Sequence, residues 1–337
     1  MQQFDVSRLS GYLEEHLEKF HGPISIYKFP RGQSNPTFRI DGLSNPIVLR
    51  RKPEGVLLKS AHAIDREYRV MLALENTGVP VPRVFHLCTD DKVIGSWFYL
   101  MEYVDGTVFS DPALPGLTSM QRKRVYDEAN RVLAAIHNVD IEINDLSDFG
   151  STGNYYERQV SRWTKQYRSS ETYALEPMEQ LMDWLSKHIP VDDGRTSLIH
   201  GDFRLDNIIF DRDDLEAIAV LDWELSTLGH PIADLAYLCM QRRMKRDLFI
   251  PGLGDLDIAE LGIPYEEDFL STYCHRTGLK EVGPWSFYLA CSFFRLAAIC
   301  QGVLKRALEG NASSEHGLEL GAMVEPLAKL GLKASKN

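Results

Sequence analysis

Short apolar runs and turn-forming residues alternate through the first hundred residues. Five runs, each bounded by Gly, Pro, Asn or Ser, predict strands over residues 24–29, 37–40, 47–51, 84–88 and 97–103. Apolar residues recur at helical spacing instead over residues 6–20 and 60–77, and Gly78 closes the second of these helices. The pattern therefore predicts a mostly antiparallel five-stranded sheet with a helix inserted after its third strand.

Beyond residue 105 the apolar spacing becomes helical. Helices are expected over residues 119–138, 155–166, 176–188, 231–242, 265–277 and 285–309. One hairpin interrupts them, with strands at 208–210 and 217–221 joined by an Asp-rich turn. Asp105-Gly106 marks the natural boundary. We expect an α+β protein of two lobes, residues 1–105 with the sheet and its helix and residues 106–337 mainly helical.

Charge divides along the same boundary. The net charge of −11 comes entirely from residues 106–337, because residues 1–105 carry thirteen acidic and thirteen basic side chains. A chain of this balance lacks the basic surface that nucleic-acid binding requires, so no nucleic-acid partner is expected. The acidic lobe is suited to attracting a cationic substrate, although solubility is the simpler interpretation.

Cysteine use and the N-terminal residues bear on the compartment. The five cysteines form no C-x-x-C pair, and their odd number argues against a disulfide framework. The first residues lack the basic and then apolar pattern of a signal peptide. No apolar run approaches the roughly 18 residues that span a bilayer. We expect a cytoplasmic protein with no membrane association.

Three polar residues near the predicted hairpin form the strongest candidate site. Asp202 and Asn207 stand five residues apart, directly before the first hairpin strand, and Asp222 follows the second. A hairpin returns to where it began, so the three side chains converge at one end. The arrangement suits one base, Asp202, and two oxygen ligands for a hard divalent cation, Asn207 and Asp222. Cap or turn roles explain each residue alone but not all three together.

The turn between the first two predicted strands is a candidate phosphate flap. Its short side chains and exposed amides suit phosphate binding, and the useful donors are Gly32, Gln33, Ser34 and Asn35. Most such sequences are plain hairpin turns, and no G-K-[ST] follows to make a Walker A loop.

A buried ion pair is expected beside this flap. Glu67 shares a helix face with Ile64 and Met71, and a carboxylate on an apolar face needs a partner. Arg50, at the end of the third strand, is the best candidate, and the pair is placed to steady nucleotide phosphates. The alternative is a surface pair between Glu67 and a neighbouring arginine of its own helix.

Three further features complete the candidate chemistry. The linker after the fifth strand offers backbone groups at Glu102 and Tyr103 to the edge of an adenine ring. Asp234, in the first turn of a helix, is expected to anchor the Asp202 loop by hydrogen bonds. The basic run 242–246 is either a solvated helix face or a contact for an anionic substrate.

Taken together, these residues resemble the aminoglycoside phosphotransferase-like kinase family. The strongest parts of the resemblance are the runs 200–207, 221–224 and 229–234, and it covers nearly the whole chain. It implies a protein-kinase-like fold of two lobes with ATP and Mg²⁺ between them. By that similarity Asp202 is the catalytic base, and Asn207 and Asp222 are metal ligands. The best-studied members of the family carry lysine where this chain has Arg50, which alters the shape of the cation but not its charge.

Within that family, the runs 32–38 and 60–68 look most like a branch found fused to, or encoded beside, acyl-CoA dehydrogenases. This resemblance implies an ATP- and Mg²⁺-dependent kinase of a small-molecule hydroxyl, either a hydroxyacyl-CoA or a hydroxy acid, with a functional link to an acyl-CoA dehydrogenase. The alternatives are an aminoglycoside- or choline-type kinase and a nucleotide-binding regulator with little catalysis.

Overall fold

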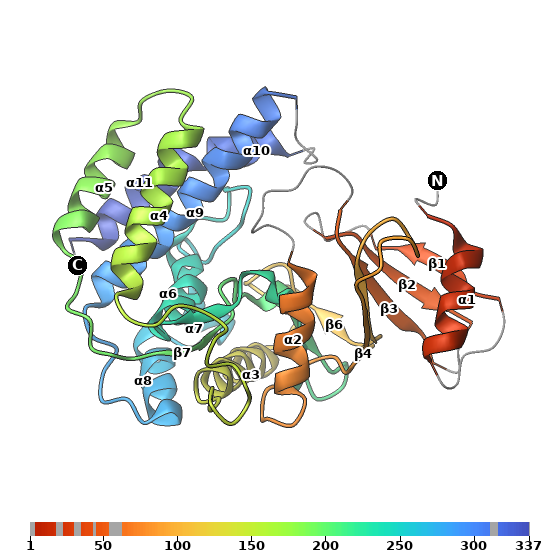
Figure 1. Cartoon of the computed structure of the whole chain (residues 1–337). Coiled ribbons are helices and arrows are strands. Elements are labelled where there is room, and N and C mark those ends of the chain that lie inside the picture. Colours follow the sequence, from red (N-terminus) through yellow and green to blue (C-terminus); the bar gives the residue numbers. More distant parts are fainter. Residues whose placement is uncertain are drawn as a thin grey trace.

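The computed structural model describes residues 4–17, 23–29, 35–42, 45–53, 63–310 and 316–336. In this part of the chain a small lobe built on a sheet stands beside a larger helical lobe (Figure 1). The N-terminal lobe is drawn in red and orange, and the C-terminal lobe runs from yellow to blue. The expected fold class, a sheet-based part followed by a helical part, is confirmed, and the boundary at residue 105 stays a prediction.

The N-terminal sheet is antiparallel throughout, with strand order β1-β2-β3-β5-β4. Its strands are β1 (Ser25–Lys28), β2 (Thr37–Asp41), β3 (Ile47–Arg51), β4 (Val84–Cys88) and β5 (Phe98–Glu102). The five-stranded sheet is therefore confirmed. Pairing of β3 with β5 places Arg50 opposite Tyr99 and Val48 opposite Met101. This register matters for the site, because these four residues all line the cleft.

Two helices cover the two faces of this sheet. Helix α1 (Val6–His16) is capped by Asp5, whose side chain accepts from two free backbone N–H groups of the first turn. Leu9 and Leu13 of this helix pack in a cluster with Phe98 and Leu100. Helix α2 (Ile64–Leu74) belongs to the other cluster, with Tyr99 and Met101. Alternate residues of β5 thus face opposite helices, as the two-residue period of a strand requires. Both helices are shorter than expected, and residues 60–62 lie outside the described part.

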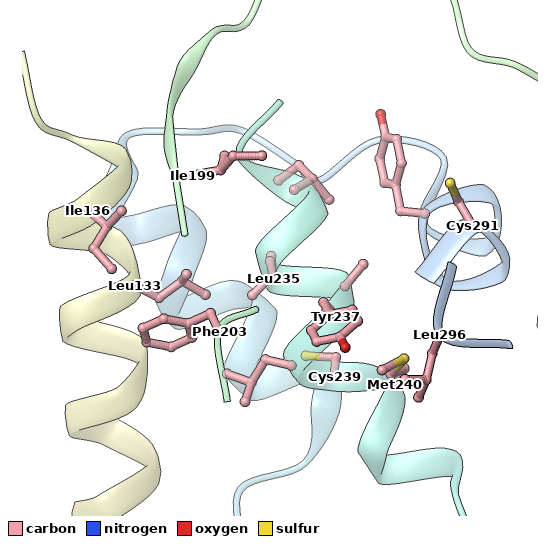
Figure 2. Packing of buried hydrophobic residues seen from close by; sticks show 14 of the residues in the cluster. Leu133, Ile136, Ile199, Phe203, Leu235, Tyr237, Cys239, Met240, Cys291 and Leu296 are labelled. Atoms are coloured by element: carbon pink, nitrogen blue, oxygen red, sulfur yellow. The ribbon is translucent and has the colours of Figure 1, made fainter. Parts of the chain in front are cut away.

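The C-terminal lobe is mainly helical. Its helices are α3 (Ser119–His137), α4 (Tyr155–Ser170), α5 (Glu176–Lys187), α6 (Ile232–Met240), α7 (Ile258–Leu261), α8 (Glu266–Thr277), α9 (Trp285–Leu308), α10 (Gly317–Ala322) and α11 (Val324–Ala334). Helix α9 packs against α4, α5, α6, α10 and α11. Figure 2 shows the part of the core where α6 lies between α3 and α9.

Short strands and 3₁₀ turns carry the polar motifs. The predicted hairpin is β8 (Ile208–Phe210) with β9 (Ala217–Val220), extended by β6 (Thr107–Val108). A second pair joins β7 (Ser197–Ile199) to β10 (Thr227–Gly229). The 3₁₀ turns are η1 (Leu205–Asn207), η2 (Trp223–Leu225) and η3 (Gln241–Arg243). The short strands β6, β7 and β10 were not expected, because runs of two or three residues carry no usable periodicity.

Helix α9 differs from expectation in one respect. By length and composition it is apolar enough to cross a membrane, whereas the sequence pattern shows no uninterrupted run of that length. Arg295 interrupts the apolar run at its middle. Within the fold, 83% of its most apolar window is buried. The helix is therefore the central core element of this lobe.

Candidate active site

Asp202 lies in the loop that leaves β7. The preceding Gly201 has φ +85°, and a Cβ there would come within 2.5 Å of the Leu225 carbonyl oxygen, so the loop requires glycine. The Asn207 side chain bridges back, with Nδ2 donating to the Asp202 carbonyl at 2.9 Å and to its carboxylate at 3.3 Å. Asp202 and Asn207 therefore lie side by side, as the spacing predicts.

One buried carboxylate holds this loop from behind. Asp234, in the first turn of α6, accepts from the backbone N–H of His200 at 2.6 Å and from that of Gly201 at 2.9 Å. Burial opposes its charge, but His137 and these N–H groups outweigh it, so the pKa of Asp234 lies below its usual range. The anchoring role predicted for Asp234 is confirmed.

His200 is fully buried and ties the two halves of the motif together. Its Nδ1 accepts from the Asp202 backbone N–H at 3.2 Å, which leaves Nε2 as the donor to the Leu221 carbonyl at 2.9 Å. Both ring nitrogens are thus hydrogen-bonded to backbone groups. This arrangement agrees with a structural role for His200 rather than proton transfer.

Asp222 reaches the site from the returning strand. The Leu221 N–H donates to the Asn207 carbonyl at 2.8 Å, so the chain segments of Asn207 and Asp222 are adjacent, and both residues line the same cavity. Asp222 has φ +66°, a left-handed conformation that aspartate tolerates better than most residues. The structure thus brings Asp202, Asn207 and Asp222 together at one end of the hairpin.

Across the cleft, Arg50 is the centre of a charge network. Its Nε lies 2.8 Å from a carboxylate oxygen of Glu67, which is 1% exposed. The Arg50 guanidinium also pairs with Asp222 and stands 3.8 Å from Glu224. Burial alone would lower the pKa of Arg50, but Glu67 and Asp222 outweigh it and raise that pKa. The predicted Arg50–Glu67 pair is confirmed, and the alternative of a surface pair is wrong because Glu67 is buried.

Asn35 connects the flap to this network. It is fully buried, and its Nδ2 donates to Glu67 at 2.7 Å and to Glu224 at 3.3 Å. Its side chain thus braces two elements, a use that the turn-forming pattern does not reveal. The other three flap candidates, Gly32, Gln33 and Ser34, lie outside the described residues.

A cavity of about 360 Å³ lies between the lobes at this point. One part of its wall is polar, formed by Arg50, Asp206, Asn207 and Asp222. The apolar part includes Phe29, Val48, Met71, Met101, Val104, Ile209 and Leu221. Glu102 and Tyr103 line it as well, which places both predicted linker residues at the cleft. A larger hollow of about 650 Å³ lies around residues 75–83 and shares only Glu102 with this cleft.

Sequence reasoning missed several residues that support the site. The Tyr99 hydroxyl donates to Glu67 at 3.0 Å. Tyr99 lies opposite Arg50 where β3 pairs with β5, and that register is the signal that would have pointed to this hydrogen bond. Glu224, two residues after Asp222, accepts from Asn35 at 3.3 Å, a contact that the motif pattern does not reveal. Tyr237 and Arg295 lie behind the Asp202 loop, and their helices read from sequence as plain core.

The arginines of the basic run 242–246 are held by neighbouring elements. Arg243 pairs with Glu266, and Arg246 pairs with Asp111. Arg242 donates to the Pro264 carbonyl at 2.7 Å. All three arginines thus contact neighbouring elements, two of them as ion pairs, and Lys245 is exposed. The run as a whole is therefore not a freely solvated face.

Comparison with known proteins identifies relatives of the whole chain. The model of the phosphotransferase enzyme family matches residues 25–270. Acyl-CoA dehydrogenase family member 10 of Mus musculus is 49% identical over 323 residues, which cover 96% of this chain and 30% of that protein. The chain spans less than half the length of the curated relatives it matches.

Solved structures share the fold. A Ralstonia eutropha protein assigned as an aminoglycoside phosphotransferase superposes with a TM-score of 0.90 at 47% identity, covering 99% of this chain and 98% of that one. Spectinomycin phosphotransferase APH(9)-Ia, in complex with ADP and spectinomycin, has a TM-score of 0.66 at 12% identity and covers both chains fully. The second likeness concerns the fold alone.

Proposed function

The chain belongs to the phosphotransferase enzyme family, and on that premise we propose that it transfers the γ-phosphate of ATP to the hydroxyl of a small molecule. The observation that carries the proposal is the cleft itself. Its apolar wall suits a purine ring, and its polar wall joins Arg50, Asn207 and Asp222 where phosphates would lie. The linker residues Glu102 and Tyr103 border the apolar part.

Asp202 is the proposed catalytic base. The acceptor oxygen attacks the γ-phosphorus, the bond from that phosphorus to the β–γ bridging oxygen breaks, and ADP leaves with the electron pair. The proton of the acceptor hydroxyl passes to the Asp202 carboxylate. Asn207 and the backbone contacts of the loop hold that carboxylate in one orientation.

The donor set fits a hard divalent cation. Asn207 donates through Nδ2 to Asp202, which leaves its Oδ1 as a candidate ligand, and Asp222 adds a carboxylate. Bound there, Mg²⁺ would neutralise charge on the β- and γ-phosphates. Arg50, held by Glu67, contributes a second positive charge to the cleft from the N-terminal lobe.

The proposed acceptor is a hydroxylated acyl compound, a hydroxyacyl-CoA or the free hydroxy acid. Relatives at 40–49% identity are named as acyl-CoA dehydrogenases, and they are more than twice as long as this chain. These names support a functional link between the proposed kinase and the oxidation of acyl-CoA. The aminoglycoside phosphotransferases solved with hygromycin B or spectinomycin bound share 12–16% identity with this chain, so they support the fold rather than the acceptor.

An acceptor screen tests the proposal. Purified protein with Mg²⁺ and ATP is incubated with hydroxyacyl-CoAs, free hydroxy acids, aminoglycosides and choline, and products are read as ADP release and as an added phosphate in mass spectrometry. We expect phosphorylation in the hydroxyacyl group. Phosphorylation of an aminoglycoside or choline alone would overturn the acceptor assignment. ATP binding without transfer to any acceptor would favour the regulator alternative.

The Asp202→Ala variant tests the base. It should lose turnover by about a thousandfold or more while binding ATP and Mg²⁺ within a few-fold of the parent protein. Asp213→Ala, an exposed change in the hairpin turn, is the matched control. Full turnover in Asp202→Ala would remove Asp202 from the mechanism and leave the family assignment intact.

A further inference from the structure

Arg295 reaches the catalytic loop from the middle of α9. Its guanidinium donates to the carbonyl oxygen of Gly201, the residue directly before Asp202. The same guanidinium lies over the Tyr237 ring at 4.9 Å and over the Trp163 ring at 5.5 Å. Two aromatic faces and one carbonyl therefore fix a single positive charge behind the loop.

Tyr237 links this cation to the carboxylate. It stands on α6, the helix that also carries Asp234, and is 3% exposed. Burial and then the neighbouring Asp202 raise the pKa of its phenol, so the hydroxyl stays protonated. A protonated phenol beside a carboxylate is a potential donor to it. Figure 2 shows Tyr237 with Leu235 and Cys239 on α6, and Leu296 and Cys291 on α9 beside it.

The burial of Arg295 at this position lowers the stability of the fold. Its Nε is buried and has no hydrogen-bond partner within the residues that the structure describes. A buried donor left unpaired costs stability, and an apolar side chain of similar length would avoid that cost. Groups of this kind are typical of functional sites, where geometry is maintained against stability.

We propose that Arg295 is a positioning residue for Asp202, acting through the Gly201 carbonyl and the Tyr237 hydroxyl. The inference rests on the proposed kinase function. Arg295 fixes the backbone before the base, and Tyr237 holds one side of the carboxylate, so that its other lone pairs face the acceptor hydroxyl. Because α9 also packs against α4, α5, α10 and α11, the base is tied directly to the helical part of this lobe.

The test compares Arg295→Met and Arg295→Lys with Arg306→Met, an exposed change on the same helix. Turnover is measured with the best acceptor of the screen. We expect kcat to fall about thirtyfold in Arg295→Met and less in Arg295→Lys, which keeps the charge, with ATP affinity within twofold of the parent. Thermal stability of Arg295→Met should be unchanged or higher. A stability loss that accounts for the activity loss would overturn the positioning role.

A second variant separates the hydrogen bond from the packing. Tyr237→Phe keeps the ring beneath Arg295 and removes only the hydroxyl, so kcat should fall about tenfold with unchanged ATP affinity. In an Asp202→Ala background, neither Arg295→Met nor Tyr237→Phe should reduce the residual rate further, because both act through the missing carboxylate. Equal losses in both backgrounds would contradict the inference.

The kinase function and the positioning role of Arg295 can be refuted separately. If the parent protein phosphorylates no acceptor, the proposed function fails, and the same variants are then compared by their slow hydrolysis of ATP, with water as the acceptor. If the parent is active and both variants keep its kcat, the positioning role fails while the kinase function stands.

Discussion

The two walls of the cleft hold their functional residues by different means. On the C-terminal side, Asp202 is fixed by a loop whose backbone N–H groups are bonded to His200 and Asp234, all within one lobe. On the N-terminal side, Arg50 is held by Glu67 and reaches across to Asp222. The C-terminal wall is organised by directional hydrogen bonds. The N-terminal wall is organised by ion pairs, in which one partner can replace another.

This difference indicates how the site changes when nucleotide binds. The loop of the proposed base, Asp202, is already ordered by hydrogen bonds within its own lobe. The Arg50–Asp222 pair, in contrast, engages a carboxylate proposed to ligate the metal, so binding must redistribute that contact. Hydrogen bonds would preserve the position of the proposed base, whereas ion pairs would let the proposed phosphate side adjust.

Removing the shared carboxylate should have the largest effect. Asp222→Ala deletes a proposed metal ligand and the cross-cleft partner of Arg50, so kcat should fall by roughly a thousandfold or more. The fall should come with weaker binding of ATP in Mg²⁺ but little change in binding without it, as measured by titration calorimetry. Asp213→Ala is again the control. If Mg²⁺ strengthens ATP binding to Asp222→Ala as much as to the parent, Asp222 is not a ligand.

Breaking the hydrogen-bonded wall should affect stability as well as rate. Asp234→Ala leaves the N–H groups of His200 and Gly201 buried without their acceptor, a loss of about 3 kcal/mol or more in the free energy of unfolding. Urea denaturation measures it. Asp234→Asn keeps one acceptor oxygen and should lose less. If kcat of the folded Asp234→Ala protein matches the parent, the loop does not need this anchor to place Asp202.

Changing the shape of the cation at constant charge should have a moderate effect. Arg50→Lys offers one ammonium where the guanidinium now contacts Glu67 and Asp222 together, so the KM for ATP should rise by about tenfold with a smaller change in kcat. Arg8→Lys, an exposed change on α1 in the same lobe, is the control. An unchanged KM would show that charge alone is used at this position.

The local part of the site could be predicted from sequence, because hairpin geometry decides it. The strand ends that carry Asp202, Asn207 and Asp222 can be predicted, because apolar runs and turn-forming residues flank them in the sequence. Glu67 could be paired with Arg50 because a carboxylate on an apolar helix face requires a nearby cation. The sheet followed from the same alternation, since β5 sends Tyr99 and Met101 to one face and Phe98 and Leu100 to the other.

The remainder depends on contacts between distant segments, which single-sequence patterns do not encode. Arg295 meets Gly201 across 94 positions, and Asn35 meets Glu224 across 189. Both residues look ordinary locally, one within an apolar helix and the other within a turn. Their roles follow from tertiary packing, which places a helix centre or a loop residue beside a motif.

The smallest predicted effect concerns the start of α6, behind the hydrogen-bonded wall. Burial lowers the pKa of His230, with Asp193 opposing this shift. The unfolded chain therefore binds more protons than the folded one as pH falls below about 6.5, so this histidine contributes stability above that pH and loses it below. The Ile232 N–H donates to Nδ1 of His230 at 3.3 Å, and the His230→Asn variant keeps an acceptor for this N–H. Its loss of unfolding free energy between pH 7.5 and 5.5 should be smaller than the parent's by about 1 kcal/mol or less. Urea curves at the two values measure this, and equal losses in both proteins would show that His230 does not contribute to acid sensitivity.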